Sequence, residues 1–419
     1  MPRDARCCDR RAGHAARVAL ERERQSRRHR GPRRPGPAAR DAAGRVAPTS
    51  ALGARLGAAA RRGGHRVTAP PALPTRFGSV APEFFEALGR ADEWRACELA
   101  LGLLDDGVPA ADVLVGLVGP AARRIGALWE SGDWSVAQEH AATCVNERVV
   151  AAVGARIPAG GSRGSIVVGC LDGEWHALPA RIVAEVLRAN GWAVTFLGAS
   201  VPAEHLASYL HQFGPDVVAL SCALPIHLPA AHRTIVAAQR TGTPVLAGGP
   251  GFGADGRWAR SLGVDAWAPG PVEAAALLEQ EPWRGAAPPA STITGASAEY
   301  VGLQERRGAL VGAAVDALEG FSPFAGAPGN PLATDPVQDA EQVVDFLAAA
   351  TYLSDDELFA DYLRWLASAL SSRGISTAAL HTVLGELAAG LHDFPFALGC
   401  LRQGREQLRR GHTNGGGER

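Results

Sequence analysis

The middle of the chain alternates between short apolar runs and longer amphipathic segments. The apolar runs, several of them rich in β-branched residues, predict five short strands with helices between them. These strands cover residues 165–170, 193–197, 217–221, 245–247 and 266–268. Strands that alternate with helices in this way form a parallel sheet. We therefore predict that residues 163–283 form a flavodoxin-like, doubly wound α/β domain.

A helical region precedes this domain. Residues 77–160 contain four amphipathic segments, and polar side chains at residues 133–135 offer an N-cap to the last of them. The segments cover residues 83–88, 96–105, 110–129 and 136–153. Four such segments joined by short connections predict a small antiparallel four-helix bundle.

A second helical region follows the α/β domain. Prolines over residues 284–296 predict a linker, and residues 297–411 are predicted to form a C-terminal helical domain. Its predicted helices cover residues 343–351, 355–371 and 376–391, with a Gly- and Pro-rich break at 322–336. Residues 412–419 are predicted to be a disordered tail. The fold class is thus multidomain, α and α/β.

Residues 1–76 differ from the rest of the chain in charge. They hold 19 arginines against 5 acidic residues, whereas the remainder holds 23 arginines against 38 acidic residues, and the chain has no lysine. Aromatic and β-branched residues are scarce in this segment, so we predict a disordered tail. A basic arm that binds nucleic acid is the alternative. We favour disorder, or a start codon assigned too far upstream, and expect no specific binding of nucleic acid.

Cysteine usage and hydropathy bear on the compartment. The seven cysteines include no CxxC pair, which is typical of buried thiols in a reducing compartment. No apolar run reaches the roughly 18–20 residues that span a bilayer. The N-terminus also lacks the apolar core of a secretory signal. We expect a cytoplasmic protein that does not contact a membrane.

One loop combines residues that suit a metal site. Asp172, Gly173, Glu174 and His176 follow the first predicted strand and precede a predicted helix. This order places them at the carboxyl edge of the sheet, where open α/β folds bind ligands. A histidine near a carboxylate can bind a metal through one ring nitrogen while the carboxylate holds the other. An ordinary loop histidine is the alternative.

Two further loops are predicted at the same edge. Ser221 ends the third strand, with Ala223 two residues later, and Gly248 and Gly249 follow the fourth strand. A serine hydroxyl can bond a ligand atom, and paired glycines let a ligand approach the backbone. Each feature alone is common in strand ends and turns. Together they are placed where one large planar cofactor would contact all three loops.

The three loops resemble the cobalamin-binding domain of methionine synthase, corrinoid methyltransferase proteins and base-off/His-on mutases. The signature of that family is Asp-x-His-x-x-Gly, Ser-x-Leu and Gly-Gly. The resemblance implies that His176 replaces dimethylbenzimidazole as the lower cobalt ligand and that Ser221 bonds the displaced base. It also implies that Gly248 and Gly249 line the slot for that base.

This sequence departs from the family signature at three positions. Glu174 stands in place of the aspartate, Pro179 in place of the glycine, and Ala223 at the third position of the serine motif. Glu174 can still orient His176, although its side chain is longer. Proline is compatible with the first turn of a helix.

The predicted bundle contains a second resemblance. Trp129 is followed after nine residues by Glu139 and His140, a spacing that resembles light-sensing cobalamin photoreceptors of the CarH/LitR type. The resemblance implies that Trp129 shields the upper cobalt ligand and that Glu139 and His140 contact the adenosyl group or the corrin amides. Packing of Trp129 in the bundle core is the alternative. Glu130 stands where that family has a light-state cobalt ligand, and residues 1–76 do not match its MerR DNA-binding domain.

We therefore expect a cobalamin-binding sensor or regulator of transcription, with adenosylcobalamin favoured over methylcobalamin and a light response as a further expectation. Its signal would pass to a protein partner or a second copy of the chain. Tyr362, Trp365 and Leu366 provide either a partner face or, as we favour, part of the C-terminal core. The enzyme-class alternative is the corrinoid carrier protein of a methyltransferase system. A module that has lost cobalamin is the third possibility.

Overall fold

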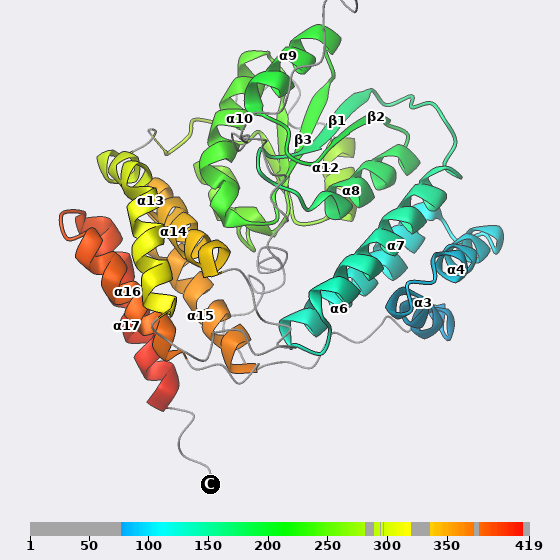
Figure 1. Cartoon of the computed structure of the whole chain (residues 1–419). Helices are drawn as coiled ribbons and strands as arrows, with labels where there is room; N and C mark the ends of the chain where they lie inside the picture. Colours follow the sequence, from blue (N-terminus) through cyan, green and yellow to red (C-terminus); the bar gives the residue numbers. More distant parts are fainter. Residues whose placement is uncertain are drawn as a thin grey trace, which may run out of the picture. The chain divides into compact units, whose positions relative to one another are not determined.

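The computed structural model describes residues 77–280, 289–293, 295, 297–319, 336–372 and 377–413. Figure 1 shows the course of these elements along the chain. The tail predicted over residues 1–76 lies outside the described residues, as do most of the break predicted at 322–336 and part of the linker predicted at 284–296.

The central sheet has five parallel strands in the order β2-β1-β3-β4-β5. They are β1 (Ser165–Cys170), β2 (Ala193–Gly198), β3 (Val217–Ser221), β4 (Val245–Gly248) and β5 (Ala266–Ala268). The chain passes outward from β1 to β2 and then returns to the other side of β1 to form β3. This reversal creates a switch point between β1 and β3, where doubly wound sheets bind ligands. The flavodoxin-like prediction is confirmed.

Successive side chains in the strands pack into two separate apolar cores, because neighbouring residues of a strand point to opposite faces of the sheet. In β1, Ile166 and Val168 belong to one core, which includes helices α8 (Ala177–Ala189) and α12 (Pro271–Gln280). Val167 belongs to the other. That second core includes α9 (Ala203–Phe213), α10 (Leu228–Arg240) and α11 (Arg257–Ser261).

The N-terminal bundle shares the core that contains α8. It consists of α3 (Val80–Gly89), α4 (Glu93–Asp105), α5 (Ala110–Val113), η3 (Leu114–Val118), α6 (Gly119–Glu130) and α7 (Val136–Gly154). The single helix predicted over 110–129 contains a π-helical segment, η3, just before Pro120. Proline has no N–H to donate, so it interrupts the regular α-helical bonding. A capping box starts α7, because the side chains of Ser135 and Gln138 each bond the other's backbone N–H.

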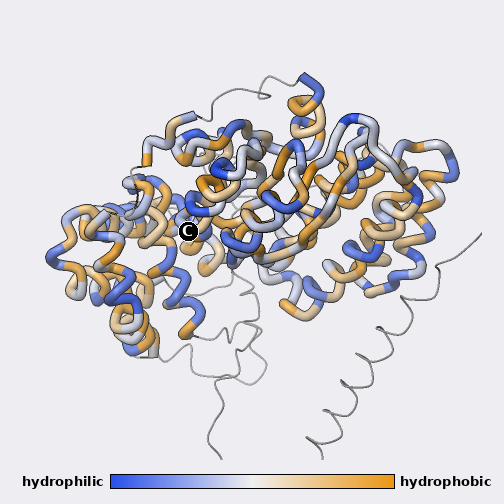
Figure 2. The backbone as a smooth tube through the Cα atoms, turned by 90° about the horizontal axis from the view of Figure 1, so that it is seen from above, coloured by the Kyte–Doolittle hydropathy of each residue, from blue (hydrophilic) through white to orange (hydrophobic). Residues whose placement is uncertain are grey.

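The C-terminal helical unit consists of α13 (Ala298–Glu319), α14 (Pro336–Leu353), α15 (Asp356–Ser372), α16 (Ala378–Gly390) and α17 (Pro395–Thr413). Tyr362, Trp365 and Leu366 are buried, so they are core residues and not an exposed partner face. Residues 412–413, which the sequence placed in a tail, continue α17. In Figure 2 hydrophilic and hydrophobic stretches alternate along the helices, as expected of helices with one apolar face.

The C-terminal helical unit is joined to the α/β domain by a shared apolar core and by polar contacts. His232 of α10 hydrogen-bonds the Tyr352 hydroxyl of α14 through Nδ1 at 2.7 Å. Trp258 of α11 donates its Nε1 proton to Asp355 at 2.8 Å, and Arg257 pairs with Glu357 at 2.8 Å. Among the described residues, the helices are too short or too polar to cross a bilayer.

Candidate cofactor site

The loop after β1 is organised around the Glu174 carboxylate, which is completely buried. One carboxylate oxygen accepts hydrogen bonds from the His176 backbone N–H, at 2.9 Å, and from His176 Nδ1. The other accepts from the backbone N–H groups of Ala223 and Leu224, at 2.7 and 3.2 Å. Glu174 therefore fixes the His176 ring and also joins the loop after β1 to the loop after β3.

The electrostatic setting keeps Glu174 ionised. Burial opposes ionisation, but the hydrogen bonds and positive potential supplied by His176 outweigh it and lower the pKa of Glu174 to about 2. A carboxylate accepts hydrogen bonds and donates none, so it favours the tautomer with the proton on Nδ1. In the neutral form of His176 the lone pair is then on Nε2.

His176 Nε2 is buried and has no hydrogen-bond partner in the described part of the chain. Buried polar atoms are normally satisfied, and an exception calls for an explanation such as a missing ion or ligand. A neutral imidazole with Nδ1 held by a carboxylate is the usual state of a histidine that ligates a metal through Nε2. The donor chemistry of His176 thus fits a single metal bond.

The two departures closest to His176 are explained by local structure. The longer side chain of Glu174 reaches both His176 and the loop after β3, which a shorter aspartate would reach less easily. Pro179 lies in the first turn of α8, where its missing N–H leaves no intrahelical bond unmade.

Ser221 and Gly248 are brought side by side. The sheet register pairs Cys170 with Ser221 and Ser221 with Gly248, so the last residues of β1, β3 and β4 form a row at the carboxyl edge. His176 lies in the loop that continues β1 beyond this row, close to the switch point.

Gly249 has a packing role that the sequence did not reveal. Its φ is +99°, a conformation that glycine adopts most readily, and a Cβ there would lie 2.3 Å from the Cys222 carbonyl oxygen. The Cys222 carbonyl also accepts a hydrogen bond from Gly251 at 2.9 Å. The loops after β3 and β4 are therefore in direct contact.

The bundle residues differ in exposure. Trp129 is 3% exposed, and it belongs to the apolar core that extends from the α/β domain into the C-terminal helices, not to that of its α6 neighbour Ile125. Glu139 and His140 lie in the first turn of α7, joined by a 2.7 Å contact between Oε2 and Nδ1. The His140 side chain is 49% exposed.

The sequence did not single out His227, which lies in η4 (Pro225–His227) after β3. A Cβ on Gly173, whose φ is +80°, would lie 3.2 Å from the His227 ring. The His227 ring therefore packs against the loop after β1. The sequence does place a histidine shortly after Ser221. Its contact with Gly173, however, depends on how the loops after β1 and β3 meet, which the sequence does not show.

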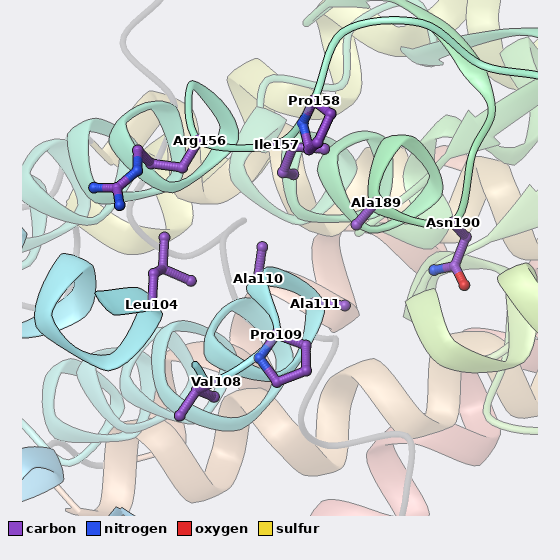
Figure 3. A pocket seen from close by; sticks show the side chains of 10 residues that line it. All are labelled: Leu104, Val108, Pro109, Ala110, Ala111, Arg156, Ile157, Pro158, Ala189 and Asn190. Atoms are coloured by element: carbon purple, nitrogen blue, oxygen red, sulfur yellow. The ribbon is translucent and has the colours of Figure 1, made fainter. Parts of the chain in front are cut away.

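A hollow of about 460 Å³ lies elsewhere, near the ends of α7 and α8 that are remote from His176. Figure 3 shows that its lining is mostly alkyl side chains, with Arg156 and Asn190 at its margin. Arg156 is already paired with Asp105 at 2.5 Å. The hollow offers no metal ligand.

Comparisons with known proteins identify the two domains around the loop after β1. Residues 80–153 and 164–277 each match a model described as a B12 binding domain. A corrinoid protein from Desulfitobacterium hafniense is 24% identical over 202 residues, which cover 45% of this chain and 91% of that protein. Dimethylamine corrinoid protein 1 of Methanosarcina acetivorans is 27% identical over 192 residues. These residues cover 44% of this chain and 87% of that protein.

A third relative is a regulator. The HTH-type transcriptional repressor CarH of Myxococcus xanthus is 33% identical over 150 residues, which cover 32% of this chain and 50% of CarH. Among solved structures, the Methanosarcina barkeri monomethylamine corrinoid protein is 19% identical, with a TM-score of 0.44. The match covers 48% of this chain and 98% of the corrinoid protein. On the two domain matches and the similarity to CarH, this chain is a cobalamin-binding domain protein that resembles CarH.

Proposed function

We propose that the chain is a cobalamin-dependent sensor in which His176 is the lower cobalt ligand. The observation that carries the proposal is the buried, unpartnered Nε2 of His176 beside an Nδ1 held by Glu174. Among the described residues, no three His, Cys, Asp or Glu side chains are grouped as for a chelated ion. The corrin ring already supplies four nitrogen ligands, so one histidine is sufficient.

The chain's own residues would bind and orient the cofactor. Glu174 keeps the proton on Nδ1 and increases the basicity of Nε2. Ser221 would bond the displaced base, and Gly248 and Gly249 would line its slot. Asp172, Gly173 and Ala223 would contribute the surrounding loop backbone. When bound, the cobalamin would supply a labile cobalt–carbon bond.

The sensor role and the preference for adenosylcobalamin rest on the bundle. Trp129 is buried in the same large apolar core as the α/β domain, and its indole would exclude water from the cofactor. Glu139 and His140 would contact the upper ligand or the corrin amides. Contacts of these side chains that depend on the upper ligand would give the cofactor a different affinity for two conformations of the chain, which is what a sensor requires.

The output would be a protein contact. Neither domain match describes a DNA-binding domain, so we propose that the cofactor state is read by a protein partner or a second copy of this chain. A direct regulator of transcription would then need such a partner to reach DNA.

The test is the absorption spectrum of the chain loaded with adenosylcobalamin, before and after green light. We expect a base-off, histidine-ligated spectrum in the dark and a changed spectrum after illumination. His176→Ala should remove the histidine signature and weaken binding about a hundredfold, at least as much as the loss of a residue that only orients a metal ligand. The matched control is His211→Ala, because His211 is an exposed histidine on α9.

Two results would contradict this proposal at different levels. An unchanged spectrum and affinity in His176→Ala would refute the cobalt ligand. Histidine ligation without any light response would leave the ligand in place and refute the photosensor.

A corrinoid carrier of a methyltransferase system is the second candidate. It is favoured by the greater coverage of the corrinoid relatives, 91% and 87% of their lengths against 50% for CarH. A carrier should bind methylcobalamin at least as tightly as adenosylcobalamin, whereas the sensor should prefer the adenosyl form. Equilibrium titration with both cofactors separates the two functions.

A further inference from the structure

The His227 ring lies between the loops after β1 and β3. It belongs to η4, which follows β3, and it packs against Gly173 of the loop after β1. The switch point between β1 and β3 is the crevice where doubly wound domains receive ligands. The His227 imidazole thus touches the loop on the other side of that switch point and lies within electrostatic range of His176.

Charges around His227 come from both sides of the crevice. Burial lowers the pKa of His227 and the charge of His176 adds to this, while the carboxylates of Glu174, Asp345 and Asp172 oppose that change. The neutral ring is therefore favoured near neutral pH, and a neutral ring can move without leaving a buried charge unpaired.

Helix α14 of the C-terminal helical unit holds η4 from the other side. The two elements pack directly, and Asp345 of α14 lies within electrostatic range of His227. Asp345 is itself fixed by Arg307 of α13, through bonds of 2.8 and 3.0 Å. The position of His227 therefore depends on α14.

The same helical unit also holds the neighbouring elements. Tyr352 of α14 bonds His232 of α10, and Asp355 after α14 accepts the Trp258 proton of α11. These helices follow the loops of β3 and β4, which contact each other through Cys222 and Gly249. A ligand that reached Ser221 would have to part loops that the C-terminal helical unit holds together.

We propose that His227 is a gate at the ligand crevice between β1 and β3 and that α14 holds it in place. This inference rests on the proposed cobalamin site. Cofactor entry displaces His227 and η4 and loosens their contact with α14. Because coupling is reciprocal, any change that loosens α14 from η4 favours cofactor binding by the same factor. The C-terminal helical unit is then the element that reports cofactor binding.

The test measures the affinity and association rate of hydroxocobalamin with the full chain by stopped-flow absorbance. His227→Ala should lower the dissociation constant, or raise the association rate constant, about fivefold. This is the lower end of the affinity changes typical of coupled sites. His211→Ala is the matched control, and thermal unfolding checks that each variant folds. His227→Asn replaces the alanine variant if that variant does not fold, with the same expected direction. A folded His227 variant that binds equally or more weakly would overturn the gate.

A second measurement separates the gate from the proposed function. Tyr352→Phe removes only the bond to His232, remote from the crevice, and should raise affinity about twofold. Hydrogen exchange in η4 and α14 should become faster when cobalamin is added. If the unmodified chain binds no cobalamin, the proposed function fails. If it binds cobalamin while α14 exchange stays unchanged, only the gate fails.

Discussion

The two edges of the central sheet differ in what they offer a ligand. At the carboxyl edge, a buried carboxylate, an unpartnered imidazole nitrogen and three strand ends converge, and the loops touch one another. At the other end of α8, toward the opposite edge, the hollow of about 460 Å³ is lined mostly by alkyl groups and by an arginine that is already paired. Open volume and ligand chemistry are thus found in different places.

This contrast teaches that chemistry locates the site better than open space. Pockets that bind cofactors combine apolar walls with a few convergent polar groups. The hollow has the walls without those groups, whereas the carboxyl edge has the groups in a closed arrangement. The contrast can be broken by substitutions at either edge or in the bundle.

The largest effect is expected from Glu174→Ala. It leaves His176 Nδ1 and the N–H groups of Ala223 and Leu224 without their acceptor, at a cost of about 3–5 kcal/mol in unfolding free energy. Cobalamin affinity should fall about a hundredfold, because the ligand is no longer oriented. Calorimetric titration and thermal unfolding measure the two effects.

Glu174→Asp is the matched variant for this prediction. It keeps the charge but is one methylene shorter, so it should bond His176 while losing contact with the loop after β3. An affinity as low as that of Glu174→Ala would show that the link between the two loops matters more than the orientation of His176.

An intermediate effect is expected from Trp129→Ala. Removing this buried indole leaves a cavity at the end of α6, so the proposed preference for adenosylcobalamin over methylcobalamin should fall about fivefold, or ~1 kcal/mol. The ratio of the two dissociation constants is the measurement, with Trp129→Phe as the control that retains most of the bulk. An unchanged ratio would place Trp129 in structural packing alone.

The smallest effect is expected from Ala111→Leu, which narrows the hollow. Cobalamin affinity should stay within about twofold and the unfolding free energy within about 0.5 kcal/mol, as for most substitutions away from buried polar features. The same titration and unfolding measurements apply. A large loss of affinity would reverse the contrast, because it would make the hollow part of the cofactor site.

Patterns that are local in the chain predicted most of the α/β domain. The apolar runs gave all five strands, and their alternation with helices predicted the parallel sheet. The carboxylate near His176 was visible as a sequence pair, and the structure joins the two side chains by hydrogen bonds. The roles of the site residues in binding cobalamin stay predictions.

Contacts between distant segments were not predictable in the same way. Tyr352 and His232 lie 120 residues apart, and Ala223 lies 49 residues from the carboxylate that it bonds. Hydrophobic spacing reports which side of a helix is apolar but not which element covers it. For the same reason, the sequence did not show that α14 packs on η4 of the α/β domain in addition to the other C-terminal helices.

The N-terminal bundle and the C-terminal helical unit share the apolar cores on opposite faces of the sheet. This arrangement limits how the chain can be shortened. A fragment ending before α13 would bare the part of α10 around His232 that Tyr352 covers, together with apolar neighbours of that core. Newly exposed apolar surface of this kind promotes self-association. A failure of such a fragment to bind cobalamin would then reflect aggregation during expression, and point substitutions in the full-length chain are the sounder route to its biology.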